Sequence, residues 1–295
     1  MADSSRPVSV RTILVPTDFS EISLDALDYA AMIADQANAS ILLLHVFESY
    51  MQNTMLQMRV DFTEIIEKGI EEKFKEIRAK NSNLAAIQIH SKVAMGKIYA
   101  EIDRVATEEK IRLIVMGTHG VSGVTNIGKY IIGSNAYRAI QSAPCPIITL
   151  REKPFRREVK SILVPLDSTP ESEQKIGIAA RWAKFFGAKI HLLAVTAFFE
   201  ELFVDVKDVT AKVREAELRL LDEGIEVEAK IVRHHAPSES VLDYANRSGS
   251  DLIMIVSGQG SHLSEMLLGS SARNIISESP VPVLSINIKK YKPED

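Results

Sequence analysis

The chain has 295 residues and a formal charge of −4, a length that suits two domains of ordinary size better than one. Apolar residues make up 46% and charged residues 25%, which is typical of a globular protein and excludes a disordered one. The pI near 6.0 excludes the basic footprint of a nucleic-acid-binding protein. A single cysteine, Cys145, excludes an intramolecular disulfide and a Cys-x-x-Cys metal motif.

No stretch of the chain has the pattern of a targeting or membrane segment. The N-terminal residues lack the apolar core of a signal peptide. The apolar run Ile41–Leu44 is flanked by Ser40 and His45, so it is far too short to span a membrane. We therefore expect a cytoplasmic protein that binds neither a membrane nor a nucleic acid.

The predicted elements of the first half alternate between strand and helix. Short β-branched or apolar runs predict strands, and apolar residues at helical spacing predict helices. In chain order we expect a strand at 12–16, a helix at 24–35, a strand at 40–46, a helix at 54–80, a strand at 86–93, a helix at 96–106, a strand at 111–116, a helix at 134–142 and a strand at 144–150. Either Ser20 or Ser23 caps the first helix.

Near-continuous apolar strands that alternate with helices predict a parallel sheet covered on both faces, an α/β fold. Such sheets bind ligands at the carboxyl ends of their strands. A glycine-rich loop leaves the predicted strand 111–116 at that edge and leads into the helix that begins at Ser134. Strand, glycine-rich loop and helix together place backbone N–H groups where an anion can bind.

The pattern then repeats. The segment 161–167 matches 12–18 at an offset of 149, and 189–195 matches 40–46 at the same offset. The last helix and strand match at an offset of 136, so the second copy is shorter by thirteen residues in between. A duplication at this period predicts two domains of one fold. The charged, proline-containing stretch Arg151–Val159 separates them, and we divide the chain into domains 1–152 and 153–295.

Four features carry a resemblance to a known family. They are the strand end Val15–Ser20, the loop start Met116–Gly120, the pair Gly133-Ser134 and the Pro-x-Pro that begins at Pro144. On these the chain resembles a tandem member of the universal stress protein family over nearly its whole length. The resemblance implies two tandem Rossmann-like domains of the adenine nucleotide alpha hydrolase type. Each would hold a five-stranded parallel sheet with helices on both faces.

Nucleotide-binding members of that family carry Gly-x-x-Gly, nine residues, and then Gly-Ser or Gly-Thr. Here Gly120, Gly123 and the pair Gly133-Ser134 satisfy this spacing. A second alignment places the first glycine pair at Gly117 and Gly120, which leaves twelve residues before Gly133, three more than the pattern. Either the glycines at 120 and 123 approach the phosphates, or an insertion lengthens the loop.

The resemblance implies that the first domain binds ATP, or ADP or AMP, with Mg²⁺ as an accompanying ion. The residues that it assigns to this site are Pro16, Thr17, Asp18, Val46, Met116, Gly117, His119, Gly120, Gly123, Gly133, Ser134 and Asn135. Each has a structural alternative: Asp18 as a turn or cap aspartate, Val46 as a core strand end, and Ser134 as a helix cap. No Walker lysine motif or carboxylate cage for a metal is visible.

His119 invites a catalytic interpretation because it lies inside the loop. No carboxylate or serine nearby in the sequence completes an acid–base set, so we expect it to shape the loop or lie beside a phosphate. We expect no catalytic residue and no protein metal site. The predicted role is nucleotide binding and signalling in a stress response. A slow ATP-hydrolysing enzyme and a nucleotide-free scaffold are the alternatives.

The second copy departs from the pattern in its loop. Asp167 and Gly269-Ser270 are retained, but only eight residues separate Gly260 from Gly269 and no Gly-x-x-Gly is present. Glu265 would add negative charge near a phosphate. We expect this domain to bind nucleotide weakly or not at all. The family resemblance also implies that the last strands pair the two halves as an internal pseudo-dimer, with a homodimer as a further option; no protein partner can be named.

Overall fold

The computed structural model describes residues 7–48, 63–120, 132–153, 158–166, 172–196, 206–233, 236–257 and 269–291. The chain divides into two compact units. The first unit is Val10–Lys153, and the second unit is the part that follows Lys153, with which residues 7–9 group.

The first unit alternates strands and helices as the sequence predicts. Its elements are β1 (Thr12–Pro16), α1 (Glu21–Ala37), β2 (Ser40–Phe47), α3 (Thr63–Lys80), the 3₁₀ helix η1 (Ser82–Leu84), β3 (Ile89–Met95), α4 (Ile98–Glu108), β4 (Leu113–Gly117), α5 (Ser134–Ser142) and β5 (Ile147–Leu150). The strands lie in the order β3-β2-β1-β4-β5, and every described pair among them is parallel. The predicted α/β class is confirmed.

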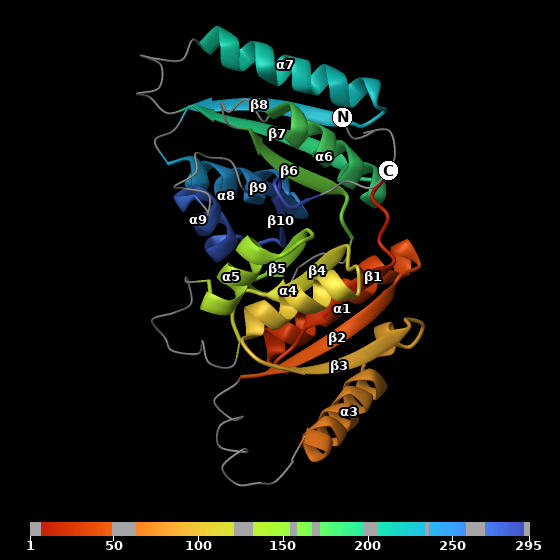
Figure 1. Cartoon of the computed structure of the whole chain (residues 1–295). Helices are drawn as coiled ribbons and strands as arrows, with labels where there is room; N and C mark the ends of the chain where they lie inside the picture. The colour runs from red at the N-terminus through yellow and green to blue at the C-terminus, as the bar shows by residue number, and fades with distance from the viewer. Residues whose placement is uncertain are drawn as a thin grey trace. The chain divides into compact units, whose positions relative to one another are not determined.

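Helices cover both faces of this sheet (Figure 1). α1 contacts β1, β2 and β4, α3 contacts β3, and both contact η1, whereas α4 and α5 pack on each other. Right-handed crossovers place α1 and α3 on one face and α4 and α5 on the other. The carboxyl ends of β1 and β4, which are neighbours, lie where the strand order changes direction, the usual position of a ligand site in such sheets.

Element boundaries differ from the predictions where local hydrogen bonding overrides the pattern. Ser20 is the N-cap of α1 and accepts from the N–H of Ser23, which decides between the two predicted caps. β3 begins at Ile89, not at residue 86, because Ile87 donates to Leu84 and thereby closes a turn after η1. β5 begins only at Ile147, since the prolines of the Pro-x-Pro have no N–H to donate to a ladder. Residues 54–62 of the predicted helix lie outside the described residues.

The second unit repeats the architecture. Its elements are β6 (Ser161–Leu166), α6 (Ser172–Phe186), β7 (Lys189–Thr196), α7 (Val206–Asp222), β8 (Val227–Arg233), α8 (Pro237–Ser248), β9 (Leu252–Ser257), α9 (Ser270–Glu278) and β10 (Val283–Asn287). The strand order is β10-β9-β6-β7-β8, again parallel. α8 and α9 pack on each other, and α6 and α7 do likewise.

Strand register and helix ends match residue by residue between the units. Thr12 pairs with Ser40 in β1 and β2, and Ser161 pairs with Lys189 in β6 and β7, which reproduces the offset read from the sequence. The helix after the third strand ends alike in both: the N–H of Ile111 donates to the carbonyl of Ala106, and that of Ser250 donates to Ala245. Positions in the two units can therefore be compared directly.

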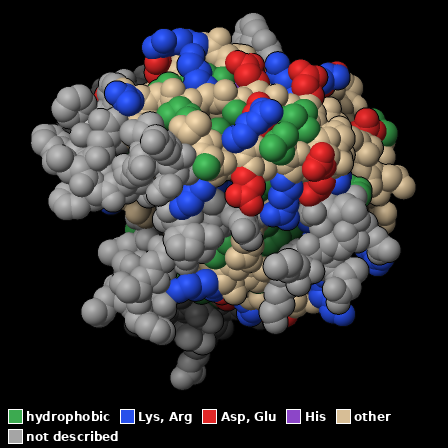
Figure 2. Space-filling model, turned by 90° about the horizontal axis from the view of Figure 1, so that it is seen from above, with side chains coloured by type: hydrophobic (Ala, Val, Ile, Leu, Met, Phe, Trp, Pro, Cys, Tyr) green, Lys and Arg blue, Asp and Glu red, His purple; other side chains and the backbone are tan. Residues whose placement is uncertain are grey.

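The cores are apolar and the described surface is charged. The strand residues Ile13, Leu14, Ile162 and Leu163 are completely buried, as the near-continuous apolar runs predict for parallel strands. Basic and acidic side chains lie beside one another on the described surface seen in Figure 2, so that face carries no large field of one sign. Within the described residues, no helix combines the length and the apolar character that crossing a membrane requires.

Candidate functional site

A cavity of about 170 Å³ lies in the first unit at the carboxyl ends of β1, β2 and β4. The residues that line it are Pro16, Thr17, Asp18, Ser23, Leu44, Val46, Ile98, Met116, Gly117, Thr118, His119, Gly120, Gly133, Ser134, Asn135 and Ala136. They come from segments far apart in the sequence. The parallel sheet brings them together because all of its strands end at this edge.

The segment after β1 is held by its own polar groups. The N–H of Thr17 donates to the carbonyl of Leu44 at 2.8 Å, which extends the ladder with β2 by one bond. The hydroxyls of Thr17 and Ser23 lie 2.9 Å apart. Asp18 accepts from the N–H and the hydroxyl of Ser20, both through Oδ1, at 3.1 and 2.5 Å. These contacts orient the Asp18 carboxylate at the mouth of the cavity.

His45 supports the same segment from the other face of β2. Its Nδ1 lies 2.7 Å from the carbonyl oxygen of Thr17, so this ring nitrogen carries the proton and donates it. The ring stacks on Phe19 with 4.9 Å between centroids, and Phe47 meets His45 edge-on. Phe19 has a φ of 63°, a left-handed conformation that costs a non-glycine residue about 1 kcal/mol. The stacking and the hydrogen bond hold the turn despite this strain.

The start of α5 is fixed against the end of β4. Thr118 donates its N–H to Leu150, and its carbonyl accepts from the N–H of Gly133, each at 2.8 Å. Gly133 is the N-cap of α5, and it makes no side-chain cap hydrogen bond. The first intrahelical bond comes from Tyr137, so among the described residues no acceptor meets the N–H groups that precede it in the first turn. These groups and the positive end of the helix dipole favour an anion.

Close backbone approach explains two glycines of the loop. A Cβ added to Gly120 would lie 2.0 Å from Asp18 Oδ2, so only glycine allows the segment after β4 to approach that carboxylate. A Cβ on Gly133 would lie 3.1 Å from the carbonyl oxygen of Thr118, where the cap bond forms. Gly120 thus lets the loop approach Asp18, and Gly133 lets the start of α5 approach Thr118.

His119 is held within the loop, and its surroundings favour the neutral imidazole. Its Nδ1 lies 2.8 Å from the hydroxyl of Thr118. Burial, and secondarily the positive charge of Arg151, lower the pKa of His119 below its usual value. Its position suits the predicted role of shaping the loop beside an anion. Among the described residues, no carboxylate contacts His119 to activate it for acid–base chemistry.

Eleven of the twelve residues predicted for the site line this cavity, and Gly123 lies outside the described residues. Ser134 is the first residue of α5, whereas Gly133 occupies the cap, so the alternative of Ser134 as the N-cap is wrong. Sequence reasoning missed Ser23, Leu44, Ile98, Thr118 and Ala136. Leu44 could have been found, because it lies two residues before Val46 on one face of β2.

The second unit keeps only part of this arrangement. Gly269 is the N-cap of α9, also without a side-chain cap bond, and Arg273 donates to it as Tyr137 does to Gly133. A Cβ on Gly269, however, would meet no atom within 4 Å in the part of the chain that the structure describes. Leu166 stands where Thr17 stands and has no hydroxyl. Asp167 and the loop 258–268 lie outside the described residues.

Neither unit offers a protein-held metal site in its described part. No group of three or more His, Cys, Asp or Glu side chains there could hold a metal ion. Cys145 is buried, and burial raises the pKa of its thiol to about 12, so it stays protonated and packs as a small apolar residue. Asp18 is the one carboxylate that lines the described cavity.

The sequence and the fold of the chain are both similar to those of known proteins. A model of the universal stress protein family matches residues 9–151 and again 158–287. Universal stress protein MJ0531 of Methanocaldococcus jannaschii is 30% identical over 146 residues, which cover 48% of this chain and 82% of the relative. Universal stress protein Slr1230 of Synechocystis sp. is 22% identical over 295 residues, 94% of this chain and 99% of its own. The crystal structure of a universal stress protein from Archaeoglobus fulgidus has a TM-score of 0.70 at 24% identity, covers 94% of this chain and 98% of its own, and has the same fold.

Proposed function

The chain belongs to the universal stress protein family, whose model matches it twice, and on that premise we propose that its first unit binds an adenine nucleotide, ATP or a close relative, in a cytoplasmic stress response. One observation carries the proposal. The N–H groups of the first turn of α5 and the Asp18 carboxylate line one cavity at the carboxyl end of the sheet.

The cavity offers each part of a nucleotide a suitable surface. Leu44, Val46, Ile98 and Met116 are apolar and suit an adenine ring. Asp18 accepts hydrogen bonds, as ribose hydroxyls require, and the start of α5 suits phosphates. At about 170 Å³ the cavity is smaller than the roughly 300–1,000 Å³ of pockets that enclose a whole ligand, so part of the nucleotide would extend beyond it. With one lining carboxylate, a Mg²⁺ ion would be held mainly by phosphate oxygens and water.

The deciding experiment measures nucleotide binding by the full chain. Nucleotide released on denaturing the purified protein is identified by mass spectrometry, and ATP is titrated calorimetrically into nucleotide-free protein. We expect one equivalent of adenine nucleotide per chain, bound by the first unit. No released nucleotide together with no titratable binding would favour the alternative of a nucleotide-free scaffold.

Binding without turnover is the expected behaviour. The lone polar side-chain partner described for His119 is Thr118, and a hydroxyl does not activate an imidazole as a general base. A turnover assay on the same preparation checks this. Repeated turnovers that are lost in a Gly133→Ala variant would make the chain a slow ATP-hydrolysing enzyme.

His45→Phe tests the support of the nucleotide site. The phenyl ring keeps the stacking on Phe19, but the hydrogen bond to the carbonyl of Thr17 is lost. One such bond contributes about 0.5–1.5 kcal/mol, so we expect the affinity for ATP to fall roughly three- to tenfold. Calorimetric titration measures the change. An unchanged affinity would show that His45 does not position the segment that holds Asp18.

A further inference from the structure

The second unit carries a groove that has no part in the proposed nucleotide site. It has a volume of about 620 Å³ and lies between α8 and the two outer strands of the sheet, β7 and β8. Lys189 and His191 of β7, Glu228 and Lys230 of β8, and Tyr244 and Arg247 of α8 line it. The counterpart of the nucleotide site would lie elsewhere, at the ends of β6 and β9 and the start of α9.

A buried polar cluster forms the floor of the groove. His191 is 2% exposed and Tyr244 is 9% exposed. The Tyr244 hydroxyl lies 3.4 Å from Nδ1 of His191, and a carboxylate oxygen of Glu228 lies 3.5 Å from the same nitrogen. Nε2 of His191 has no hydrogen-bond partner among the described residues. Burying an unsatisfied polar group costs about 1–3 kcal/mol, so apolar side chains would be the more stable choice here.

The first unit has apolar side chains at the two corresponding positions. By strand register His191 corresponds to Leu42, since these residues pair with Glu228 and His90 at the same point of the third strand. By the matching helix ends Tyr244 corresponds to Val105. Leu42 and Val105 are buried aliphatic residues. A histidine and a tyrosine therefore replace two aliphatic side chains at one place in the duplicated fold.

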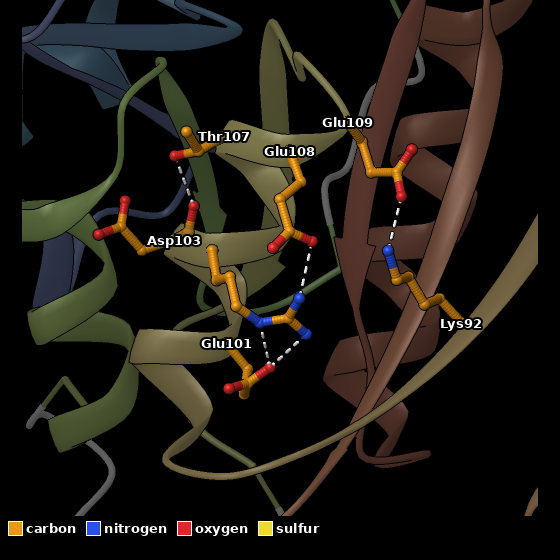
Figure 3. A network of polar contacts seen from close by, with 7 residues as sticks. Lys92, Glu101, Asp103, Thr107, Glu108 and Glu109 are labelled. Atoms are coloured by element: carbon orange, nitrogen blue, oxygen red, sulfur yellow. Dashed lines mark hydrogen bonds and ion pairs between the residues drawn. The ribbon is translucent and has the colours of Figure 1, made fainter.

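The first unit also has an ion pair at this place, between the third strand and the following helix, that the second unit lacks. Lys92 of β3 forms an ion pair of 2.6 Å with Glu109, just after α4, which ties the strand to the helix (Figure 3). In the second unit Lys230 takes the place of Lys92, and Ser248 takes the place of Glu109. The Lys230 ammonium lies 5.6 Å from the centre of the Tyr244 ring instead. No strand-to-helix ion pair forms at this position of the second unit.

Along the helix the signs of the charges are exchanged. In α4, Arg104 binds Glu101 and Glu108 at 2.6 and 2.7 Å. In α8 the corresponding residues are Asp243 and Arg247, which pair with each other. The charge of Arg247 is neutralised by Asp243 within the same helix. Lys189 and Lys230 of the strands therefore remain as lining cations for a ligand.

Two ammonium groups therefore face the groove without a carboxylate partner. Neither Lys189 nor Lys230 forms an ion pair with any described residue, and they come from adjacent strands. Glu239, near the start of α8, is the one lining carboxylate without a described partner. Counted over all of its lining side chains, the groove carries four lysines and arginines (Lys189, Lys230, Arg233 and Arg247) and three carboxylates (Glu228, Glu239 and Asp243), so positive charge exceeds negative charge by one. Ammonium groups bind phosphate and carboxylate as compact point charges.

We propose that this groove binds a small multivalent oxyanion, with Lys189 and Lys230 holding its charges above the polar floor of His191 and Tyr244. Phosphates and polycarboxylates share this chemistry. The second unit, whose nucleotide loop departs from the family pattern, would then have a ligand site of its own. This site does not depend on nucleotide binding by the first unit.

Titration of the full chain with two probes, inorganic pyrophosphate and citrate, tests the proposal. The amide ¹H–¹⁵N signals of β8 and α8 report binding at the groove, whatever happens in the first unit. We expect saturable shifts of these signals at low ionic strength, weakened by added salt. A double variant, Lys189→Gln with Lys230→Gln, removes the two charge-assisted contacts to the oxyanion. Its binding should be weaker at least tenfold. Saturation by one probe alone identifies the source as phosphate or carboxylate.

Matched variants separate the site from general charge effects. Lys92→Gln, at the position in the first unit that corresponds to Lys230, should leave binding unchanged. His191→Leu with Tyr244→Val installs the pair that the first unit uses, so the fold should survive while binding weakens severalfold. Shifts that stay linear with both probes, or that persist in the double lysine variant, would overturn the proposal. So would an equal loss in Lys92→Gln.

Discussion

Gly120→Ala is expected to weaken ATP binding by the full chain at least about tenfold while the fold stays intact. The added Cβ would lie 2.0 Å from Asp18 Oδ2, and a carboxylate at the end of a side chain moves more easily than the backbone of the segment that follows β4. The substitution therefore displaces the group that is proposed to bind the nucleotide, at little cost to the core. Calorimetric titration of ATP measures the affinity, and thermal unfolding checks the fold.

Gly269→Ala is a control for the effect of a glycine-to-alanine change outside the proposed site; by position it corresponds to Gly133. Gly269 caps α9 in the second unit, and a Cβ there meets no atom of the described residues within 4 Å. It should leave the affinity for ATP unchanged, and the midpoint of unfolding should fall slightly because alanine is a poorer N-cap than glycine. If Gly120→Ala binds ATP as tightly as the unchanged protein, the loop does not approach the nucleotide and the proposed site is misplaced.

The fold could be predicted from the sequence because its signals are repeated. Thr12–Pro16 and Ser161–Leu166 carry the same apolar run, and each forms a buried strand. β1 lies between β2 and β4, and β6 lies between the corresponding strands β7 and β9. What the pattern did not reveal was where pairing begins. The third strand starts three residues later than its alternating pattern predicts, because η1 and the bond from Ile87 to Leu84 hold the preceding residues in a turn. Such bonds depend on local geometry that hydrophobic periodicity does not record.

The candidate site was predictable where it rests on glycines and a carboxylate. Gly120 and Asp18 carry a family resemblance, and the structure brings them into contact. His45 escaped prediction because it faces away from the cavity on the strand whose other face carries Leu44 and Val46. Its role depends on a carbonyl oxygen of the neighbouring segment, and a main-chain acceptor leaves no mark in the sequence.

The duplicated chain shows how two copies of one fold diverge. In the first unit the polar, glycine-dependent contacts gather at the carboxyl ends of the central strands, and aliphatic residues, Leu42 of β2 and Val105 of α4, are buried at the places that correspond to the polar floor of the groove. In the second unit a polar pair, His191 and Tyr244, lies beneath the outer strands. Periodicity alone could not reveal that pair, because a histidine or tyrosine on a buried strand or helix face fits the amphipathic pattern as well as an aliphatic residue does.

Asp18→Ala is expected to lower the affinity for ATP about tenfold to a hundredfold. A hydrogen bond to a charged group contributes roughly 1.5–3 kcal/mol, and every 1.4 kcal/mol corresponds to a factor of ten. The carboxylate also accepts from Ser20, so part of the effect could arise from the turn. Ser20→Ala removes the hydroxyl contact to Asp18 together with the N-cap bond to the N–H of Ser23. It should weaken binding less than Asp18→Ala, and thermal unfolding measures the cost of the lost cap. Calorimetric titration of the three proteins separates the two contributions.

The corresponding aspartate of the second unit provides the control, and a double variant tests the mechanism. Asp167→Ala should leave ATP binding unchanged, because the nucleotide is proposed to bind in the first unit only. An equal loss in Asp167→Ala would mean that both halves bind. In an Asp18→Ala background, Gly120→Ala should add little further loss, since the carboxylate that the new methyl group displaces is already absent. Such non-additivity is the signature of two residues that act through one contact. Fully additive losses would instead mean that Gly120 approaches the nucleotide directly, with Asp18 acting independently.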